Sequence, residues 1–85
     1  MSDLKKRFED AAAAVKKLKD DPGNDVKLQL YALYKQGSEG DVAGKRPGFT
    51  DMIGRAKYDA WAKAKGTTKD EAMKKYVELV KSLSG

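Results

Sequence analysis

Apolar side chains recur every three or four positions in four separate stretches of the chain, which is the period of an amphipathic α-helix. The pattern predicts helices over residues 4–19, over residues 25–36 with room for one further turn, and from Thr50 or Asp51 to residue 64. A fourth helix is predicted to begin within residues 65–68, and its apolar stripe reaches Leu83. No stretch alternates polar and apolar positions over the length of a strand. The pattern therefore predicts an all-α fold, a bundle of four helices.

Residues that break or cap helices separate these stretches. Pro22 and Gly23 are expected to stop the first helix, and four glycines and a proline in residues 37–48 predict a long loop between the second and third helices. Gly66 is a candidate for the glycine that ends the third helix. Side chains suited to N-terminal caps precede each helix. They are Ser2 or Asp3, Asn24 or Asp25, Thr50 or Asp51, and Thr68 with Glu71 or, in a competing frame, Thr67 with Asp70.

The second helix carries two faces of different character. At about 100° per residue, Tyr31, Tyr34 and Lys35 share one side of the helix, whereas Leu30 and Leu33 lie on an adjoining arc together with Val26. A packed core requires only the apolar arc. The aromatic and cationic side suits a ligand with a flat ring next to a phosphate, and Leu28 near Lys35 adds an apolar element to it.

Three further residues have both a structural and a functional interpretation. Lys57 interrupts the apolar stripe of the third helix, so its ammonium group is expected either to extend to solvent or to meet an anion. Trp61 is expected to anchor the core. Tyr76 lies in the middle of the last stripe, where its hydroxyl needs a partner from a neighbouring residue, water or a ligand; core packing explains its position equally well.

The composition excludes several classes of site. The chain of 85 residues has no cysteine and no histidine, so disulfides, thiolate chemistry and histidine acid–base chemistry are absent, and zinc or haem sites are not expected. No carboxylates are grouped as a catalytic dyad, so no catalytic residue, metal site or cofactor is predicted. The N-terminus lacks the apolar segment of a secretory signal, and no apolar run approaches the ~20 residues that span a bilayer. We therefore expect a single cytoplasmic domain over residues 1–85, without membrane insertion.

The net charge of +5 favours an anionic partner, although basic and acidic residues alternate along the chain. Planar rings stack on nucleobases, and ammonium groups act as point charges for phosphate. Nucleic acid and a free nucleotide both fit these groups, but only three scattered arginines are present, and a few convergent groups suit a single nucleotide-bearing ligand better. The candidate residues are Phe8, Lys16, Tyr31, Tyr34, Lys35, Lys57 and Tyr76.

Several motifs together give the chain a family resemblance. They are Tyr31-Ala-Leu-Tyr34-Lys35-Gln36, Gly40-Asp41 with Arg46-Pro47-Gly48, Lys57-Tyr58-Asp59-Ala60-Trp61, Lys65-Gly66-Thr67, and the run from Glu71-Ala72-Met73 to Tyr76. In this order and spacing, from about Phe8 to the end of the fourth helix, the sequence resembles the acyl-CoA-binding protein family. The resemblance implies an up-down-down-up four-helix bundle with a bowl-like site. It also implies a monomeric, non-enzymatic carrier that takes part in fatty acid metabolism and lipid transport.

The resemblance further implies the ligand and the residues that hold it. Medium- and long-chain fatty acyl-CoA esters are expected to bind non-covalently, with acyl-CoA-using enzymes as transient partners and no nucleic acid. The adenine and 3′-phosphate of the CoA head are assigned to Lys16, Tyr31, Tyr34, Lys35, Lys57 and Tyr76, and further contacts to Phe8, Ala11, Ala12 and Leu28. The alternative class is a small basic helical module that binds nucleic acid or protein.

The chain departs from the usual family pattern at four positions. Tyr58 stands where tryptophan is common, Asp21 and Ile53 stand where many relatives have lysine, and Lys27 stands where an apolar residue often lies under the acyl chain. These departures leave the residues assigned to the nucleotide unchanged and bear on affinity and acyl chain-length preference.

Overall fold

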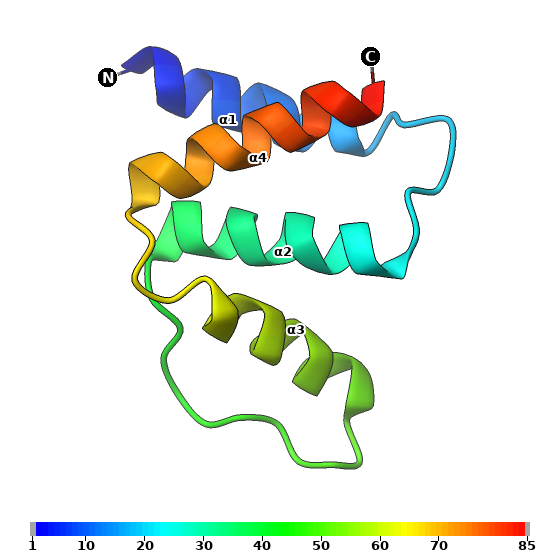
Figure 1. The fold of residues 1–85 in the computed structure, drawn as a ribbon, viewed down its shortest axis with the longest axis vertical. Coiled ribbons are helices and arrows are strands. Elements are labelled where there is room, and N and C mark those ends of the chain that lie inside the picture. The colour runs from blue at the N-terminus through cyan, green and yellow to red at the C-terminus, as the bar shows by residue number, and fades with distance from the viewer. Residues whose placement is uncertain (1, 85) are drawn as a thin grey trace.

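The computed structural model describes residues 2–84, without the side chain of Ser2, and contains four α-helices. They are α1 (Ser2–Val15), α2 (Asn24–Glu39), α3 (Met52–Lys63) and α4 (Lys69–Ser84). The helices α1 and α4 run in one direction and α2 and α3 in the other, which confirms the up-down-down-up bundle (Figure 1). Within residues 2–84, no helix has the length and apolar character needed to cross a lipid bilayer.

The bundle is flat. The Cα positions span 37 × 30 × 15 Å, so the shortest dimension is half of the next one. The main helix contacts follow this arrangement: α4 packs on α1 and on α2, and α3 packs on the other side of α2 (Figure 1). Because α2 is central and the layer is thin, side chains on both faces of α2 reach the surface.

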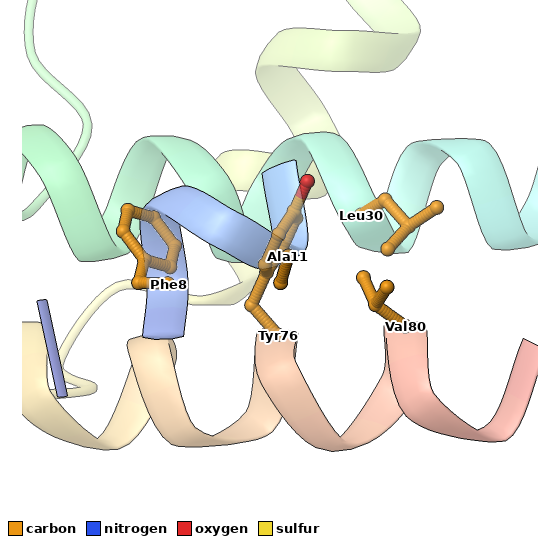
Figure 2. Close-up of a cluster of buried hydrophobic side chains, with 5 residues drawn as sticks. All are labelled: Phe8, Ala11, Leu30, Tyr76 and Val80. Carbon is orange, nitrogen blue, oxygen red and sulfur yellow. The ribbon is translucent and has the colours of Figure 1, made fainter. Parts of the chain in front are cut away.

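The core lies where α1, α2 and α4 meet. Figure 2 shows Tyr76 and Val80 extending from α4 toward α2, where Leu30 meets them. Phe8 and Ala11 complete this cluster from α1, and all five side chains are buried. These positions belong to the apolar stripes of their helices, so burial of those stripes accounts for the packing of α1, α2 and α4.

Two helix boundaries differ from the sequence-based prediction. The first helix ends at Val15 and not at residue 19, because Lys16, Lys17 and Leu18 close a tighter turn with bonds to the third residue back. The second helix continues to Glu39, within the one further turn that the prediction allowed, so Gly37 is helical and does not begin the loop. The Gly37 backbone packs against Phe8 and Met73, where an added Cβ would lie 3.1 Å from a carbon of each. This close approach explains why a glycine lies within a helix here.

The predicted caps are confirmed for two helices. Asp51 accepts a hydrogen bond from Gly54 N at 3.0 Å and begins α3, and Thr68 accepts one from Glu71 N at 3.1 Å at the start of α4. The prediction for α2 was wrong, because its N-terminal cap is Gly23, which makes no side-chain cap bond. For α1, Asp3 lies inside the first turn, and the Ser2 side chain lies outside the described residues.

The loop between α2 and α3 is fastened to the helices at several points. Arg46 binds Asp59 through two hydrogen bonds of 2.8 and 2.7 Å, and the Tyr58 hydroxyl donates to Gly44 O at 2.9 Å. The Trp61 indole N–H donates to Gly40 O at 2.9 Å. Asp59, Tyr58 and Trp61 of α3 therefore hold this loop against the helix through hydrogen bonds.

A second set of bonds joins the start of this loop to the turn before α4. Gln36 is fully buried, and its Nε2 donates to Asp41 Oδ1 at 2.8 Å and to Thr67 O at 2.7 Å. The same Asp41 oxygen accepts from Gly66 N at 3.0 Å. The Gly66 bond, followed by the Gln36 bond, holds the pKa of Asp41 below its ordinary value of 3.8. Gly66 has a φ of +94°, which favours glycine at this turn.

The apolar stripe of the third helix is only partly covered. Phe49, Met52 and Ile53 are 78, 77 and 72% exposed, and α3 contains no fully buried residue. The periodicity correctly placed these side chains on one face, but no element of the described chain packs on its first half. The helix α3 therefore packs against α2 mainly through its second half. The small residues Ala56 and Ala60 line a hollow between α3 and α2.

Candidate functional site

A groove of about 700 Å³ lies between α1, α2 and α4 and extends to Lys57 of α3. Five of the predicted site residues line it directly: Lys16, Tyr31, Tyr34, Lys57 and Tyr76. Ala12, predicted as a further contact, lies in the wall contributed by α1. Residues of α1, α2, α3 and α4 thus meet at one open groove.

The bottom of the groove contains a cluster of three aromatic rings. Phe8 stacks on Tyr34 with ring centroids 5.3 Å apart and 20° between the ring planes. Phe8 also meets Tyr76 edge to face at 5.1 Å, and Tyr34 lies 5.9 Å from Tyr76. Phe8 is buried, whereas Tyr34 is 42% exposed, so the cluster passes from the core to the surface. Such ring pairs stabilise one another beyond simple burial, which fixes the orientation of both tyrosines.

Tyr76 combines the two functions that its sequence position left open. Tyr76 is buried in the core, with only 4% of the residue exposed. It also lines the groove. The hydroxyl lies at the end of the side chain that points toward α2 (Figure 2), and it has no hydrogen-bond partner within residues 2–84. Burial, assisted by the nearby Tyr34, raises the pKa of Tyr76 above its ordinary value of 10.0. The hydroxyl is therefore neutral and able to donate a hydrogen bond to a group in the groove.

Lys57 crosses from α3 to the aromatic side of α2. Its Nζ lies 5.5 Å from the centroid of the Tyr31 ring, a cation–π arrangement. Lys57 makes no ion pair with any residue in the described part of the chain. The ammonium group is thus available to an anion at the mouth of the groove, next to a ring on which a flat molecule can stack. Lys16, just after α1, also lies at the groove without an ion pair among the described residues.

Of the six residues assigned to the CoA head, Lys35 is the one that does not line the groove. Its ammonium group forms an ion pair with Glu39 and lies 5.1 Å from the centroid of the Trp61 ring. The hydrogen bond that Lys35 donates to the Glu39 carboxylate raises the pKa of Lys35 above its ordinary value of 10.5. Trp61 is half-buried between this cation and the loop, so it is not a core anchor. The role of Lys35 in holding a phosphate stays a prediction.

A second hollow of about 450 Å³ continues the site between α2 and α3. It shares Lys27, Tyr31 and Lys57 with the groove, and Leu28, Met52, Ile53 and Ala56 give it an apolar lining. The remaining predicted contacts divide between these places: Leu28 lines the hollow, whereas Ala11 is buried in the core beside Phe8. A charged, ring-lined groove therefore opens into a neighbouring apolar hollow.

Some groove residues were not predicted. Glu9, Ala13 and Val15 line the wall from α1, and Lys27 lies where the groove meets the apolar hollow. Glu9, Ala12, Ala13 and Lys16 are spaced as i, i+3, i+4 and i+7, so they share one side of a helix. That spacing was a usable signal, but the strongly apolar stripe on the neighbouring side of the same helix obscured it.

The ion pair of Lys27 draws its ammonium group toward the start of α2. Its Nζ lies 2.9 Å from Asp21 Oδ2, and the other carboxylate oxygen accepts from Gly23 N at 2.8 Å. These contacts, first the bond from Lys27, hold the pKa of Asp21 below its ordinary value of 3.8. The four-carbon stem of Lys27 is then left as apolar lining between groove and hollow.

The side chains that line the groove are of types that bind anions and flat rings. Among the residues that the structure describes, no three histidine, cysteine, aspartate or glutamate side chains are grouped closely enough to hold a metal ion. The groove offers three tyrosines and three lysines, with Glu9 as its one acidic neighbour among the lining residues. These groups suit stacking, hydrogen bonding and charge pairing.

A flat four-helix bundle with an open groove of tyrosines and lysines, joined to an apolar hollow, defines a non-covalent binding protein for an anionic molecule with a planar ring and an apolar part. The chain belongs to the acyl-CoA-binding protein family. Residues 5–80 match the model of the family described as "Acyl CoA binding protein".

Individual relatives agree with this assignment. The chain is 54% identical over 76 residues to acyl-CoA-binding protein homolog 1 of Caenorhabditis elegans, which covers 89% of this chain and 88% of the relative. It is also 52% identical over 79 residues to human enoyl-CoA delta isomerase 2, covering 93% of this chain but only 20% of that protein. The similarity therefore concerns one part of the isomerase.

Solved structures show the same fold. The crystal structure of Oryza sativa acyl-CoA-binding protein 2 superposes with a TM-score of 0.91 at 44% identity, covering 94% of this chain and 89% of that chain. The crystal structure of an acyl-CoA-binding protein from Moniliophthora perniciosa gives a TM-score of 0.82 at 42% identity, covering 88% of this chain and 74% of that chain. Both values confirm the fold that the sequence predicted.

Proposed function

We propose that this protein binds medium- and long-chain fatty acyl-CoA esters in the tyrosine–lysine groove and the adjoining hollow, and that it buffers and transports them in the cytoplasm as a monomeric single domain. The observation that carries the proposal is the position of Lys57, whose Nζ lies 5.5 Å from the centroid of the Tyr31 ring where groove and hollow meet. A cation beside a partly exposed ring supplies the two interactions that suit a nucleotide, charge pairing for its phosphate and stacking for its base.

Each part of the ligand has a matching surface. The adenine ring is assigned to Tyr31 and Tyr34, and the 3′-phosphate to Lys57 with Lys16 and Lys35. The Tyr76 hydroxyl, which is free to donate, is assigned to a polar group of the CoA head. A phosphate monoester carries close to two negative charges, and bonds from ammonium groups to such an anion are stronger than neutral hydrogen bonds.

The acyl chain is assigned to the hollow lined by Leu28, Met52, Ile53 and Ala56. Met52 and Ile53 are among the most exposed apolar side chains of the protein, and an acyl chain would remove their surface from water. Burial yields roughly 0.8 kcal/mol per CH₂ group. The chain would thus supply much of the affinity, while the head group would supply much of the specificity.

This function is that of a carrier, not of an enzyme. The groove provides no histidine or cysteine, and its lysines and tyrosines are arranged to hold charge and rings. No cofactor is needed for such binding, and acyl-CoA-using enzymes would act as transient partners. The alternative of a nucleic-acid or protein-interaction module is not favoured. The matching family model and the Caenorhabditis elegans relative are both named for acyl-CoA binding.

Calorimetric titration with palmitoyl-CoA, free CoA and palmitate tests the proposal. The ester should bind most tightly, because only it occupies both the groove and the hollow. Lys57→Met should weaken binding of palmitoyl-CoA roughly tenfold or more, in the range for loss of a charge-assisted bond. Lys74→Met, at an exposed lysine that does not line the groove, is the matched control and should bind as the wild type. Equal affinity for palmitate and palmitoyl-CoA would refute the assignment of the groove to the CoA head.

A further inference from the structure

The lysines around the site fall into two groups. Lys16 and Lys57 form no ion pair within residues 2–84, whereas Lys27 is bound to Asp21 and Lys35 to Glu39. The Lys35 side chain is 25% exposed and is held between the Glu39 carboxylate and the face of Trp61. One of the cations assigned to the phosphate is therefore already occupied by an anion of the protein itself.

Helix stabilisation explains the pair of Lys35 and Glu39 only weakly. Glu39 is the last residue of α2, where the helix dipole is negative and a carboxylate is unfavourable, and Lys35, one turn earlier, is the basic residue that offsets it. The order is also the weaker one, since a lysine four residues before a glutamate stabilises a helix less than the reverse. The pair thus gives α2 little support, and its cation belongs to the residue that follows Tyr34 of the groove.

We infer that Glu39 is a specificity-determining residue of the site, because it competes with the ligand phosphate for the ammonium group of Lys35. The inference rests on the proposed function. In the free protein Glu39 satisfies Lys35 and holds it over Trp61. A phosphate monoester, with nearly twice the charge of a carboxylate, replaces Glu39 as the partner of Lys35. Glu39 thereby lowers the gain in affinity that a ligand obtains from its phosphate. It sets the ratio of the affinities for ligands with and without that phosphate.

The chain offers a matched control for net charge. Glu39→Gln and Asp21→Asn each remove one negative charge and free one lysine near the site, but only the first frees Lys35. The two substitutions therefore share any general effect of a more positive protein. They differ in the effect on the cation assigned to the phosphate.

Calorimetric titration of the wild type and both variants with dodecanoyl-CoA and with its 3′-dephospho form tests the inference. Glu39→Gln should bind dodecanoyl-CoA about two- to fivefold more tightly, the factor that corresponds to an exposed ion pair. It should bind the dephospho ester as the wild type does, so its ratio of the two affinities rises. Asp21→Asn should leave that ratio unchanged. Without ligand, Glu39→Gln should also shift the emission of Trp61, because Lys35 is no longer fixed above the indole.

Three outcomes would overturn the inference: no gain for dodecanoyl-CoA in Glu39→Gln, an equal gain for both ligands, or the same rise of the ratio in Asp21→Asn. Failure of the proposed function has a separate signature, since the wild type would then bind neither ester. Wild-type binding of both esters with equal affinity would leave the carrier function intact and would refute the inference, because no phosphate contact would remain for Glu39 to oppose. Circular dichroism of the variants confirms that the helices are retained.

Discussion

Phe8 of α1 stacks on Tyr34 of α2, with ring centroids 5.3 Å apart, and places the buried core in direct contact with the floor of the groove. The same Phe8 ring supports Tyr76 from a second direction at 5.1 Å. Because one buried side chain orients two groove tyrosines, the stability of the bundle and the shape of the site depend on the same contacts. Substitutions at this point should therefore affect folding and ligand binding together.

Phe8→Ala should lower the free energy of unfolding by about 3–5 kcal/mol, since it leaves a cavity in the core and removes two ring contacts. Phe8→Leu keeps most of the volume and should cost less, about 1.5 kcal/mol. Urea denaturation measures both changes. In Phe8→Leu, which stays folded, binding of palmitoyl-CoA should still weaken, because Tyr34 and Tyr76 lose their supporting ring. Unchanged binding would show that Phe8 does not position the groove tyrosines.

Gly37→Ala should destabilise the protein even though alanine favours a helix more than glycine does by about 1 kcal/mol. The new methyl group would lie 3.1 Å from carbons of Phe8 and Met73, and overpacking of this kind costs about 1–3 kcal/mol. Thermal unfolding should show a lower midpoint. Gly48→Ala, where an added Cβ meets no atom within 4 Å, is the control and should leave the midpoint unchanged or raise it.

The stability of the protein should fall in acid partly through Asp41. Its pKa in the folded state lies below the ordinary value of 3.8, so the unfolded state binds the proton more readily. The stabilising contribution is complete above that ordinary value and is lost as the pH falls through the folded pKa. Asp41→Asn should therefore be less stable than the wild type at pH 7 and should lose less stability between pH 5 and pH 2.

Urea titrations at several pH values measure these slopes. Asp10→Asn, at an exposed carboxylate of α1, is the control for the loss of one negative charge, and its slope is compared with that of Asp41→Asn. An unchanged slope in Asp41→Asn would contradict the role of the Gly66 and Gln36 bonds.

Arg46→Gln should loosen the loop between α2 and α3 without unfolding the protein. The substitution removes the paired bonds to Asp59, but an exposed ion pair adds little to global stability. Amide hydrogen exchange should become faster for residues 42–48 and remain unchanged in α2 and α4. Arg7→Gln, at an exposed position of α1, should leave exchange in the loop as it is. Uniformly faster exchange would indicate that the pair stabilises the whole bundle.

The sequence predicted the helices well because amphipathic spacing reports which side chains share a face. It gave less about helix ends. Gly37 was assigned to the loop from its residue type, but the close approach of Phe8 and Met73 requires a small residue inside a helix at that point. The contact that explains the glycine joins three helices, so it is absent from any local pattern.

The same limit applies to the exposed stripe and to Lys35. Spacing placed Phe49, Met52 and Ile53 on one side, but it carries no information on whether another element covers that side. Spacing also predicts that Lys35 and Tyr31 share one side of α2, and their backbone positions, four residues apart in the helix, agree with this. The long side chain then carries its ammonium group to Glu39 and Trp61, and charge pairing decides its position.

The sequence by itself determined the four amphipathic helices, the types of group that meet a ring and a phosphate, and, through ordered motifs, the family. Only the tertiary structure decided that Lys57 lies over Tyr31, that Tyr76 serves core and groove together, and that Glu39 holds Lys35. The physical reason is that helical periodicity is a local property of three or four residues. Distances between side chains of different helices depend on how the helices pack, and that packing is fixed by contacts between distant parts of the chain.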